Sequence, residues 1–399
     1  MTRPAANPGR DAGAALHSVE TPVAVVDVAR ARANARRVAA YAAAHGLAWR
    51  PHVKTHKSRR VARLQLQAGA RGLTVATPRE AEVMSTVTSD LLLAYPPVGE
   101  ARVRRVASLP AHVRLKVALD SEAVLGPLAA AAREAGRTVE VLVELDVGLR
   151  RVGVAGPEAA VALAAAAAGA QGTTFGGLLF YAGHIRAPGP DQERDLAALG
   201  DHLRRVYDAL DAAGLPPATV SGGTTPTLWR SHEVPGLTEI RPGTCIYNDR
   251  DALGQGAARP EDLAYTVLAT VVSTAVPGRA AVDAGSKALA KEERGGAGYG
   301  VLLDRPEVTV VALSEEHGML DLSRTDWRPA VGERVRIVPN HVCTSVNLQD
   351  AVLAVHPDAP PELWPLEGRG RGPFHPDTTP PADDPTGTHP QEPLYEAPA

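Results

Sequence analysis

A lysine among basic side chains is the residue of this sequence best suited to covalent chemistry. Lys54 lies within residues 50–58, directly after an apolar stretch that predicts a β-strand. Neighbouring positive charge disfavours the ammonium form of an amine, and a deprotonated lysine can attack a carbonyl carbon. We therefore expect Lys54 to be a nucleophile, with a solvated basic turn as the alternative. Its basic neighbours are Arg50, His52, His56 and Lys57.

Polar and glycine-rich segments follow several other predicted strands. In a closed barrel of parallel strands, the carboxyl ends of all strands lie on one face, and that face carries the active site. The residues at these strand ends are therefore the expected site residues. In chain order they are Arg150, Arg151, Tyr181, His184, Ser221, Gly222, Gly223, Thr224, Thr225, Gly243 and Thr244.

The segment 221–227 has the composition of a phosphate-binding loop. Its glycines let backbone N–H groups converge, its threonines offer hydroxyl groups, and a helix that begins near Pro226 would add a positive partial charge. The alternative is an ordinary turn. A phosphate site together with a strand-end lysine suggests pyridoxal 5'-phosphate held by Lys54 as a Schiff base, with Arg151 or Arg150 as the donor to its pyridine nitrogen.

A second cluster with metal-binding chemistry lies far along the chain. His341 and Cys343 are two residues apart, a spacing that places both side chains on one face of a β-strand. Imidazole and thiolate suit Zn²⁺, with Mn²⁺ and Co²⁺ as alternatives. Two protein ligands leave positions for water and substrate, as in catalytic metal sites. The alternative is a buried cysteine beside a structural histidine.

The elements that must position these residues follow one another as alternating strands and helices. Eight β/α repeats predict a (β/α)8 TIM-type barrel in the α/β class, with a doubly wound open sheet as the alternative. From about residue 265, short β-rich runs without helical patterns predict a second, mostly antiparallel β-domain. The predicted barrel strands are residues 48–53, 72–76, 90–94, 113–118, 140–145, 175–180, 218–221 and 237–241.

We expect four segments along the chain. Residues 1–20 are predicted to be flexible, and residues 21–255 to form the barrel, although the strand at 21–27 could instead join the β-domain. Residues 256–366 are predicted to form the β-domain with the metal pair. Residues 367–399 are rich in proline and poor in apolar periodicity, which predicts a disordered tail.

Composition narrows the class of partner. The 399 residues carry a formal net charge of -3, which gives no electrostatic footprint for nucleic acid or an anionic membrane. Two cysteines, Cys245 and Cys343, are too few and too far apart for a disulfide framework. No export signal or membrane span is predicted. We therefore expect a cytoplasmic protein with small-molecule partners.

Taken in order, several motifs resemble those of the D-threonine aldolase and D-serine dehydratase family, in the alanine-racemase-like fold class of pyridoxal-phosphate enzymes. The resemblance implies a pyridoxal-phosphate barrel, a C-terminal β-domain and a homodimer. It implies that Lys54 is the Schiff-base lysine, that Arg151 faces the pyridine nitrogen, that residues 221–227 bind the phosphate, and that His341 and Cys343 bind the metal. The motifs, within about residues 21–355, are TPVAVVD, RPHVKTHKS, DVGLRRVGV, SGGTTPT, EIRPGT, DAGSKAL, LSEEHG and NHVC.

The activity implied by this resemblance is a metal-dependent lyase acting on D-3-hydroxy-α-amino acids. We expect the D-threonine aldolase type of cleavage, to glycine and an aldehyde, with metal-bound hydroxide or His184 as the base and Tyr181 as a further candidate catalytic residue. The alternative is a D-serine dehydratase, in which Lys54 removes the α-proton. Similar aldolases often carry His-x-Asp at the metal pair, so Cys343 is more like the dehydratases.

Two further alternatives remain for the reaction. An amino-acid racemase would need a second base but no metal pair. A non-catalytic pyridoxal-phosphate carrier would keep Lys54 and the phosphate loop, and it too would have no use for His341 and Cys343.

Overall fold

The computed structural model describes residue 16 and residues 18–186 and 188–374, and it divides into two compact units. The barrel unit comprises the described residues of Ala35–Gly243, Gln255–Ala257 and Glu367–Ala399. The β unit comprises the described residues of Met1–Asn34, Thr244–Gly254 and Ala258–Leu366. Most of the N-terminal segment predicted to be flexible lies outside the described residues.

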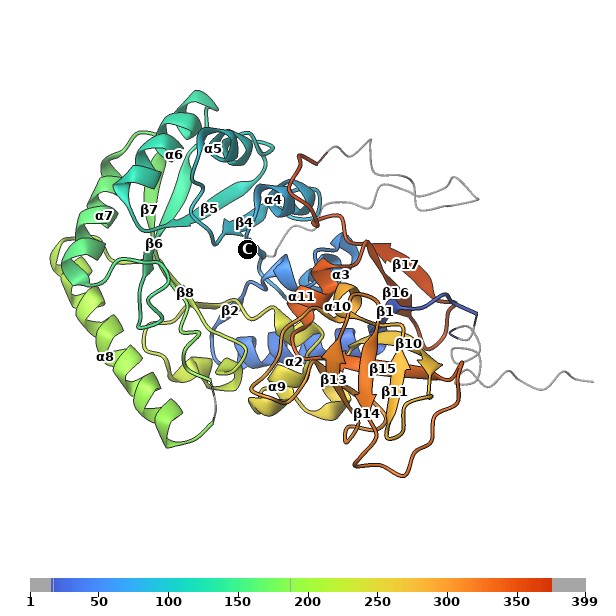
Figure 1. Ribbon diagram of the computed structural model, residues 1–399. Coiled ribbons are helices and arrows are strands. Elements are labelled where there is room, and N and C mark those ends of the chain that lie inside the picture. The colour runs from blue at the N-terminus through green and yellow to red at the C-terminus, as the bar shows by residue number, and fades with distance from the viewer. Residues whose placement is uncertain (1–15, 17, 187, 375–399) are drawn as a thin grey trace, which may run out of the picture. The chain divides into compact units, whose positions relative to one another are not determined.

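The barrel unit contains a parallel sheet of eight strands among its described residues, one for each predicted strand (Figure 1). Their spatial order is β2-β9-β8-β7-β6-β5-β4-β3. A parallel bridge between His52 and Thr74 joins the two ends, so the predicted (β/α)8 barrel is confirmed over the open sheet. The strands are β2 (Ala48–Trp49), β3 (Leu73–Val75), β4 (Asp90–Leu93), β5 (Arg114–Leu119), β6 (Val139–Leu145), β7 (Thr173–Phe180), β8 (Thr219–Gly222) and β9 (Glu239–Ile240).

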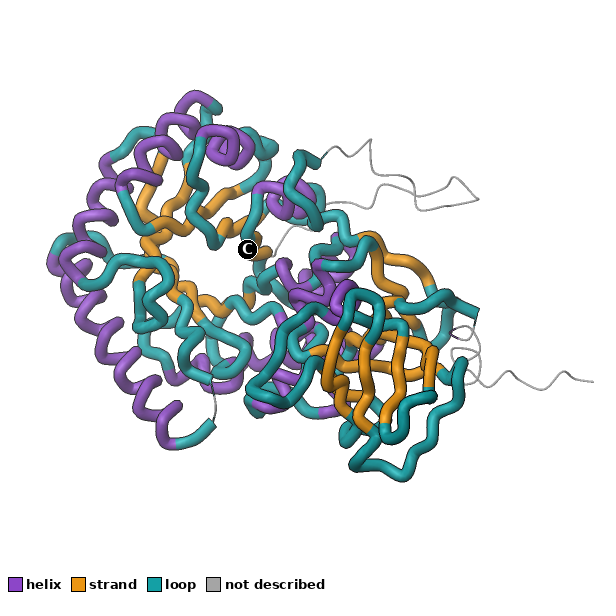
Figure 2. The backbone as a smooth tube through the Cα atoms, in the orientation of Figure 1, coloured by secondary structure: helices purple, strands orange, loops and turns teal. Residues whose placement is uncertain are grey.

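Helices alternate with these strands and surround the ring of strands (Figure 2). Local signals fix where they begin: the hydroxyl of Thr77 accepts from the Glu80 N–H at 3.1 Å, and Pro78 occupies the first turn, where it needs no hydrogen-bond partner. The helices are α2 (Val28–Ala44), α3 (Arg59–Gln67), α4 (Pro78–Met84), α5 (Glu100–Ala107), α6 (Glu122–Glu134), α7 (Pro157–Gly169) and α8 (Pro190–Ala212).

Side chains fill the barrel interior in layers, because alternate residues of each strand point inward. In β6 the inward positions are Glu140, Leu142 and Glu144, from the amino end to the carboxyl end. An apolar middle layer therefore separates a charged floor from the carboxyl-end face that carries the predicted site residues. The middle layer consists of Leu92, Ala118, Leu142 and Leu179.

The β unit is built on a mostly antiparallel sheet of nine described strands, in the order β11-β14-β13-β12-β15-β10-β1-β16-β17. A further pairing of β11 with β10 closes six of them into a ring, which confirms the predicted second domain of antiparallel strands. The strands are β1 (Val23–Asp27), β10 (Tyr265–Ser273), β11 (Arg279–Val282), β12 (Gly300–Leu302), β13 (Thr309–Leu313), β14 (Gly318–Asp321), β15 (Arg334–Pro339), β16 (Ala351–Val355) and β17 (Glu362–Pro365).

The first strand of the chain belongs to this sheet. β1 pairs with β10 in antiparallel fashion and with β16 in parallel fashion, so residues from both ends of the chain form one sheet. Strands β12, β14 and β17, of three or four residues each, are not among the runs predicted from the sequence. The short helices of the β unit are α9 (Arg250–Gly254), α10 (Ser286–Leu289) and α11 (Val342–Asn347).

Residues 367–374 differ from the prediction of a disordered tail. The Gly368 N–H donates to the Lys57 carbonyl at 2.8 Å, and the guanidinium of Arg79 lies 4.8 Å from the centroid of the Phe374 ring. This segment holds a buried carboxylate and an aromatic ring, which give it specific partners on the barrel despite its proline-rich surroundings. The rest of the predicted tail lies outside the described residues.

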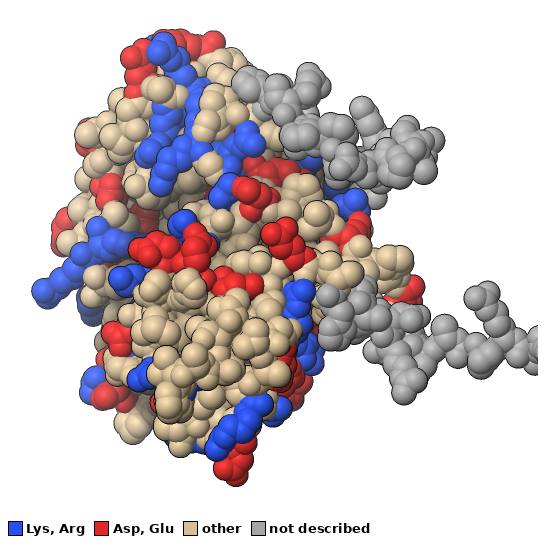
Figure 3. Space-filling model, turned by 45° about the vertical axis from the view of Figure 1, so that its right-hand side comes forward, with Lys and Arg blue, Asp and Glu red and all other residues tan. Residues whose placement is uncertain are grey.

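The charged surface agrees with the modest net charge of the sequence. Lysine and arginine side chains are interspersed with aspartate and glutamate on the face shown in Figure 3. Within the described ranges, no helix is both long and apolar enough to span a membrane.

Candidate active site

Lys54 lies where β2 has ended, in a short 3₁₀ helix, Val53–Thr55. His52 precedes this helix in extended conformation, and its Nδ1 accepts from the Lys54 backbone N–H at 3.4 Å. The side chain of Lys54 is exposed, and within the described part of the chain its amine makes no hydrogen bond or ion pair. The amine is thus available to a ligand at the carboxyl-end face of the barrel.

The positive neighbours predicted to activate Lys54 are neutralised or neutral. Arg50 is buried and bound to Asp90 at 2.5 Å and to Glu239 at 2.7 Å. Lys57 is bound to the buried carboxylate of Glu80 at 2.5 Å. The expectation that a cluster of cations surrounds Lys54 is therefore wrong, because acidic residues far away in the sequence pair with these cations.

The two histidines beside Lys54 are uncharged for a different reason. Burial, reinforced by the charge of Lys54, lowers the pKa of His52 well below its ordinary value. Burial also lowers the pKa of His56 to about 3, against the opposing hydrogen bonds to Gln65 and Ser58. Both rings are therefore neutral at pH 7.

The residues predicted after β6 and β7 lie together. The guanidinium of Arg151 lies over the ring of Tyr181, 4.8 Å from its centroid, which is the geometry of a cation–π contact. His184 packs against Gly148 of the same β6 loop, where an added Cβ would come within 3.2 Å of the His184 Nε2. Arg150 is exposed and has positive φ. The structure therefore brings Arg151, Tyr181 and His184 into one group.

The segment after β8 divides into a structural half and an open half. The Ser221 hydroxyl donates to Glu239 at 2.7 Å and accepts from Arg241 at 2.8 Å, so it is engaged inside the barrel wall. Gly222 serves packing, because an added Cβ would lie 2.4 Å from Cζ of Phe180.

The open half begins at Gly223, whose φ of +79° suits a residue without a side chain. The hydroxyls of Thr224 and Thr227 are 2.9 Å apart. Among the described residues, the backbone N–H groups of Gly223, Thr224 and Thr225 donate to no protein acceptor. Three N–H groups without protein acceptors in one turn could hold an anion such as a phosphate.

Gly243, predicted as a cofactor residue, lies against the loop of Lys54. An added Cβ at Gly243 would come within 2.3 Å of the His52 carbonyl oxygen, so only glycine permits this approach. Thr244 belongs to the β unit, and its hydroxyl lies 3.8 Å from the Cys343 sulfur.

Two buried charged residues at the carboxyl-end face were not predicted as site residues. Arg241 donates to the Phe180 carbonyl at 2.7 Å, and burial lowers its pKa to about 10. Burial raises the pKa of the Glu144 carboxyl, against the opposing charges of Arg241 and Arg151. A charged residue at or directly after the carboxyl end of a barrel strand was the signal that could have identified both.

The predicted metal pair lies at a turn from strand to helix. His341 follows β15 in extended conformation, with φ -133°, and Cys343 is the second residue of α11. The prediction that both lie on one strand is therefore wrong, since the chain turns between them. The two side chains nevertheless interact with each other.

Asp249 supports this pair and was not predicted from the sequence. Its Oδ2 accepts from the His341 Nδ1 at 3.0 Å. Burial lowers the pKa of His341, but the hydrogen bonds and charges of Asp249 and Cys343 outweigh this and raise it to about 11. In the described part of the chain no group of three histidine, cysteine or acidic residues is arranged to hold a metal, so His341 and Cys343 would need non-protein ligands.

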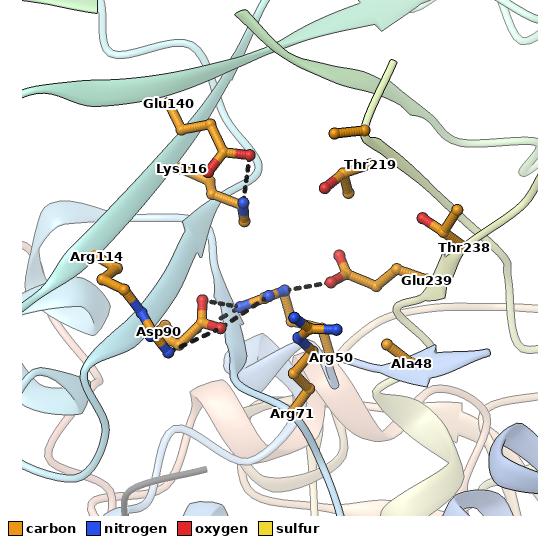
Figure 4. Close-up of a pocket in the computed structure, with 11 residues that line it drawn as sticks. Ala48, Arg50, Arg71, Asp90, Arg114, Lys116, Glu140, Thr219, Thr238 and Glu239 are labelled. Atoms are coloured by element: carbon orange, nitrogen blue, oxygen red, sulfur yellow. Dashed lines mark hydrogen bonds and ion pairs between the residues drawn. The ribbon is translucent and has the colours of Figure 1, made fainter. Parts of the chain in front are cut away.

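A separate pocket of about 440 Å³ opens at the amino ends of the barrel strands (Figure 4). Its charged side chains pair with one another: Arg50 binds Asp90 and Glu239, and Lys116 binds Glu140. This pocket is the floor of the barrel, on the side opposite to Lys54 and the phosphate-type loop, and its paired charges serve barrel closure.

These features define a barrel with an exposed lysine and a turn of backbone N–H groups without protein acceptors, together with a β unit that carries a histidine–cysteine pair. The family model of the alanine racemase N-terminal domain matches residues 26–251, and that of the serine dehydratase domain matches residues 264–355. The chain therefore belongs to the D-threonine aldolase and D-serine dehydratase family of the alanine-racemase fold class, and it is a pyridoxal-phosphate-dependent lyase.

Characterised relatives match over nearly their whole length. The chain is 35% identical to the D-threo-3-hydroxyaspartate dehydratase of Delftia sp. (strain HT23), over 88% of this chain and 97% of the relative. It is 31% identical to the D-threonine aldolase of Arthrobacter sp., over 91% of this chain and 96% of the relative.

Solved structures show the same relationship. The D-threonine aldolase of Filomicrobium marinum superimposes with a TM-score of 0.82 at 32% identity, covering 89% of this chain and 97% of that chain. A cysteine-to-alanine variant of D-threo-3-hydroxyaspartate dehydratase, in the metal-free form, superimposes with a TM-score of 0.79 at 31% identity, covering 90% and 99%. A histidine-to-alanine variant of the same enzyme also matches, and the two replaced residues are two positions apart.

Proposed function

We propose that this chain is a divalent-metal-dependent lyase acting on D-3-hydroxy-α-amino acids, and that its reaction is dehydration to a 2-oxo acid and ammonia. The observation that carries this proposal is the interacting pair of His341 and Cys343, with Asp249 bound to the imidazole. The dehydratase relative has been studied as variants of a histidine and a cysteine with the same spacing. A thiol at this position therefore favours dehydration.

The residues of the barrel unit fit pyridoxal 5'-phosphate. Lys54 offers an amine without a protein partner, the turn Gly223 to Thr225 offers N–H groups for the phosphate, and Arg151 offers a guanidinium for the pyridine nitrogen. When bound, this cofactor supplies an electron sink for negative charge at the α-carbon. The Ser221 hydroxyl is already hydrogen-bonded to Glu239 and Arg241 in the barrel wall, so we do not include it among the phosphate ligands.

Lys54 would move the α-proton of the substrate. The imidazoles of His52 and His56 are neutral, so they do not repel the positive charge that the Lys54 amine gains when it accepts this proton. His341 and Cys343 would hold the metal, for which Zn²⁺ fits nitrogen and sulfur ligands best. A metal held there would supply Lewis-acid assistance to the departure of the β-hydroxyl group.

Retro-aldol cleavage is the second candidate reaction. The structural match to a D-threonine aldolase favours it, with a TM-score of 0.82. In that reaction, His184 is the candidate group for taking the proton of the β-hydroxyl, since it lies with Arg151 and Tyr181 at the carboxyl-end face. We further propose a cytoplasmic homodimer, which analytical ultracentrifugation of the holoenzyme would test.

Product analysis of the holoenzyme tests the reaction. Protein loaded with pyridoxal 5'-phosphate and Zn²⁺ is incubated with D-serine, D-threonine and 3-hydroxy-D-aspartate, with the L-isomers as controls. A 2-oxo acid with ammonia supports dehydration, whereas glycine with an aldehyde from D-threonine would replace it by the aldolase reaction. Full activity after the metal has been removed by a chelator would refute the metal requirement.

The role of Lys54 has its own test. Lys54→Ala should remove the visible absorbance of the bound cofactor and lower the rate by about 10²–10⁴-fold, the usual value of a positioned proton-transfer group. Lys291→Ala, at an exposed lysine of the β unit, is the matched control and should keep both. An unchanged spectrum in Lys54→Ala would contradict the assignment.

A further inference from the structure

We propose that Asp249 is the positioning residue of the metal site, fixing the His341 imidazole so that its Nε2 is presented to the metal. This inference rests on the proposed metal-binding role of His341 and Cys343. It adds to that role a residue of the β unit that lies 92 positions earlier in the sequence than His341.

Asp249 is fully buried and held by three hydrogen bonds. Its Oδ2 accepts from the His341 Nδ1 at 3.0 Å and from the Val342 backbone N–H at 2.9 Å. Its Oδ1 accepts from the Ala252 N–H at 2.8 Å, which ties the carboxylate to the start of α9. The carboxylate therefore has a single orientation, and it holds both the ring and the backbone of the turn that leads into α11.

The chemistry of imidazole explains why this contact matters. A neutral histidine that ligates a metal through one ring nitrogen carries its proton on the other. An ionised carboxylate can only accept hydrogen bonds, so Asp249 fixes the proton on Nδ1 and leaves the lone pair of Nε2 directed away from it. The same contact increases the electron-donating power of the ring toward a metal.

A neighbouring acid does not share this role. Asp251 lies 4.0 Å from the His341 Nδ1, beyond hydrogen-bond distance, and it is bound by the Arg294 guanidinium. Asp249 and Asp251 therefore offer a comparison at matched charge. One carboxylate is hydrogen-bonded to the ring, and the other is only near it.

Metal affinity is the direct test, and it does not depend on turnover. The holoenzyme and its Asp249→Asn variant are titrated with Zn²⁺ against a chromophoric chelator. An amide keeps the size of the side chain but has one acceptor oxygen in place of two, so it cannot serve all three donors. We expect the dissociation constant to rise by about 10–100-fold, the usual effect of losing such a contact. Asp251→Asn should change it by less than about threefold, as expected for a loss of charge without a hydrogen bond.

A double-mutant cycle separates positioning from a merely structural role. If Asp249 acts through His341, Asp249→Asn should have no further effect on Zn²⁺ affinity once His341 is alanine. An equal loss in both backgrounds would overturn the inference, as would a wild-type affinity in Asp249→Asn. If the wild-type protein binds no Zn²⁺, the proposed metal site fails as well, and this outcome is distinct from the other two.

Discussion

The cations next to Lys54 in the sequence form ion pairs with acidic residues that are remote in the sequence. Arg50 and Lys57 are cations next to the lysine in the chain, but Asp90, Glu239 and Glu80 neutralise them. Sequence proximity alone could not reveal this, because the acidic partners come from other strands and helices. The lysine itself was predictable, since a lysine directly after a strand-like apolar stretch is a local signal.

The partners of the Ser221 hydroxyl were also not predictable from its neighbours in the sequence. The sequence predicts a phosphate ligand, but the residue lies within β8, where it bonds to Glu239 of β9 and to Arg241, which directly follows β9. Thr224 and Thr225 lie beyond the strand, where the chain turns. The end of β8 thus decides which side chains of the loop face the wall and which are available.

The burial of His56 predicts that the folded protein loses stability as pH falls below about 6.5. Its Nδ1 accepts from the Ser58 N–H at 3.2 Å, and its Nε2 lies 3.0 Å from Gln65 Oε1, so the fold holds the neutral ring. The folded pKa is about 3, so between the unfolded value near 6.5 and pH 3 only the unfolded chain takes up this proton. The neutral His56 ring therefore contributes fully to stability above pH 6.5. Between pH 6.5 and pH 3 the free energy of unfolding falls by about 1.4 kcal/mol for each unit by which pH decreases.

Urea denaturation between pH 4.5 and 7.5 measures this effect. In His56→Gln the group that titrates is gone, so the free energy of unfolding should depend less steeply on pH than in the wild type, by about 1.4 kcal/mol per unit below pH 6.5. Equal slopes for the two proteins would show that His56 is not held neutral by the fold.

At the scale of elements, Arg50 connects three strands of the barrel floor. It leaves the end of β2 and binds Asp90 of β4 and Glu239 of β9 (Figure 4). β2 and β9 are only two residues long, so their ladder contributes few hydrogen bonds. The buried ion pairs therefore supplement the backbone where the barrel closes.

Replacing Arg50 should open this closure. Arg50→Met removes the buried cation that binds both Asp90 and Glu239, and breaking such a buried ion pair should cost about 3–5 kcal/mol of unfolding free energy. Arg71→Ala, at an exposed arginine that lines the same pocket, is the matched control and should stay within about 0.5 kcal/mol of the wild type. Chemical denaturation of both variants measures the difference, and similar losses would argue against a specific role for Arg50.

Alternation of strands and helices made the eight barrel strands predictable, because strand-like runs recur between helical stretches along the chain. The turn that carries His341 and Cys343 was not predictable in this way. β15 ends at Pro339 and α11 begins at Val342, and so few residues contain no pattern that distinguishes an extended chain from a helical turn. The chemistry of the pair was visible, but its backbone was not.

At the scale of the whole molecule, each of the two units combines segments that are far apart in the sequence, whereas the predicted segments are continuous. β1 comes first in the chain, but it lies between β10 and β16 in the sheet of the β unit. The described residues Glu367 to Phe374 follow the β unit in the chain but belong to the barrel unit. Contacts between segments that are distant in the sequence determine to which unit each segment belongs, and no local sequence pattern predicts such contacts.

The contacts of the segment Glu367 to Phe374 predict a link between this segment and cofactor binding. Glu367 accepts from the Arg59 backbone N–H at 3.1 Å and from its side chain at 2.9 Å. The Gly368 N–H binds the carbonyl of Lys57, three residues after Lys54. The segment therefore holds the end of the loop that carries the proposed Schiff-base lysine.

Two truncations test this link. A chain ending at Leu366 loses all of these contacts, and a chain ending at Phe374 keeps them. Charge-assisted hydrogen bonds contribute about 1.5–3 kcal/mol each, so the shorter chain should melt roughly 5–10 °C lower. It should also bind pyridoxal 5'-phosphate more weakly, because the loop of Lys54 loses its support, while the longer chain should match the full-length protein in both respects. Equal cofactor affinity in the two truncated proteins would confine the segment to a role in stability.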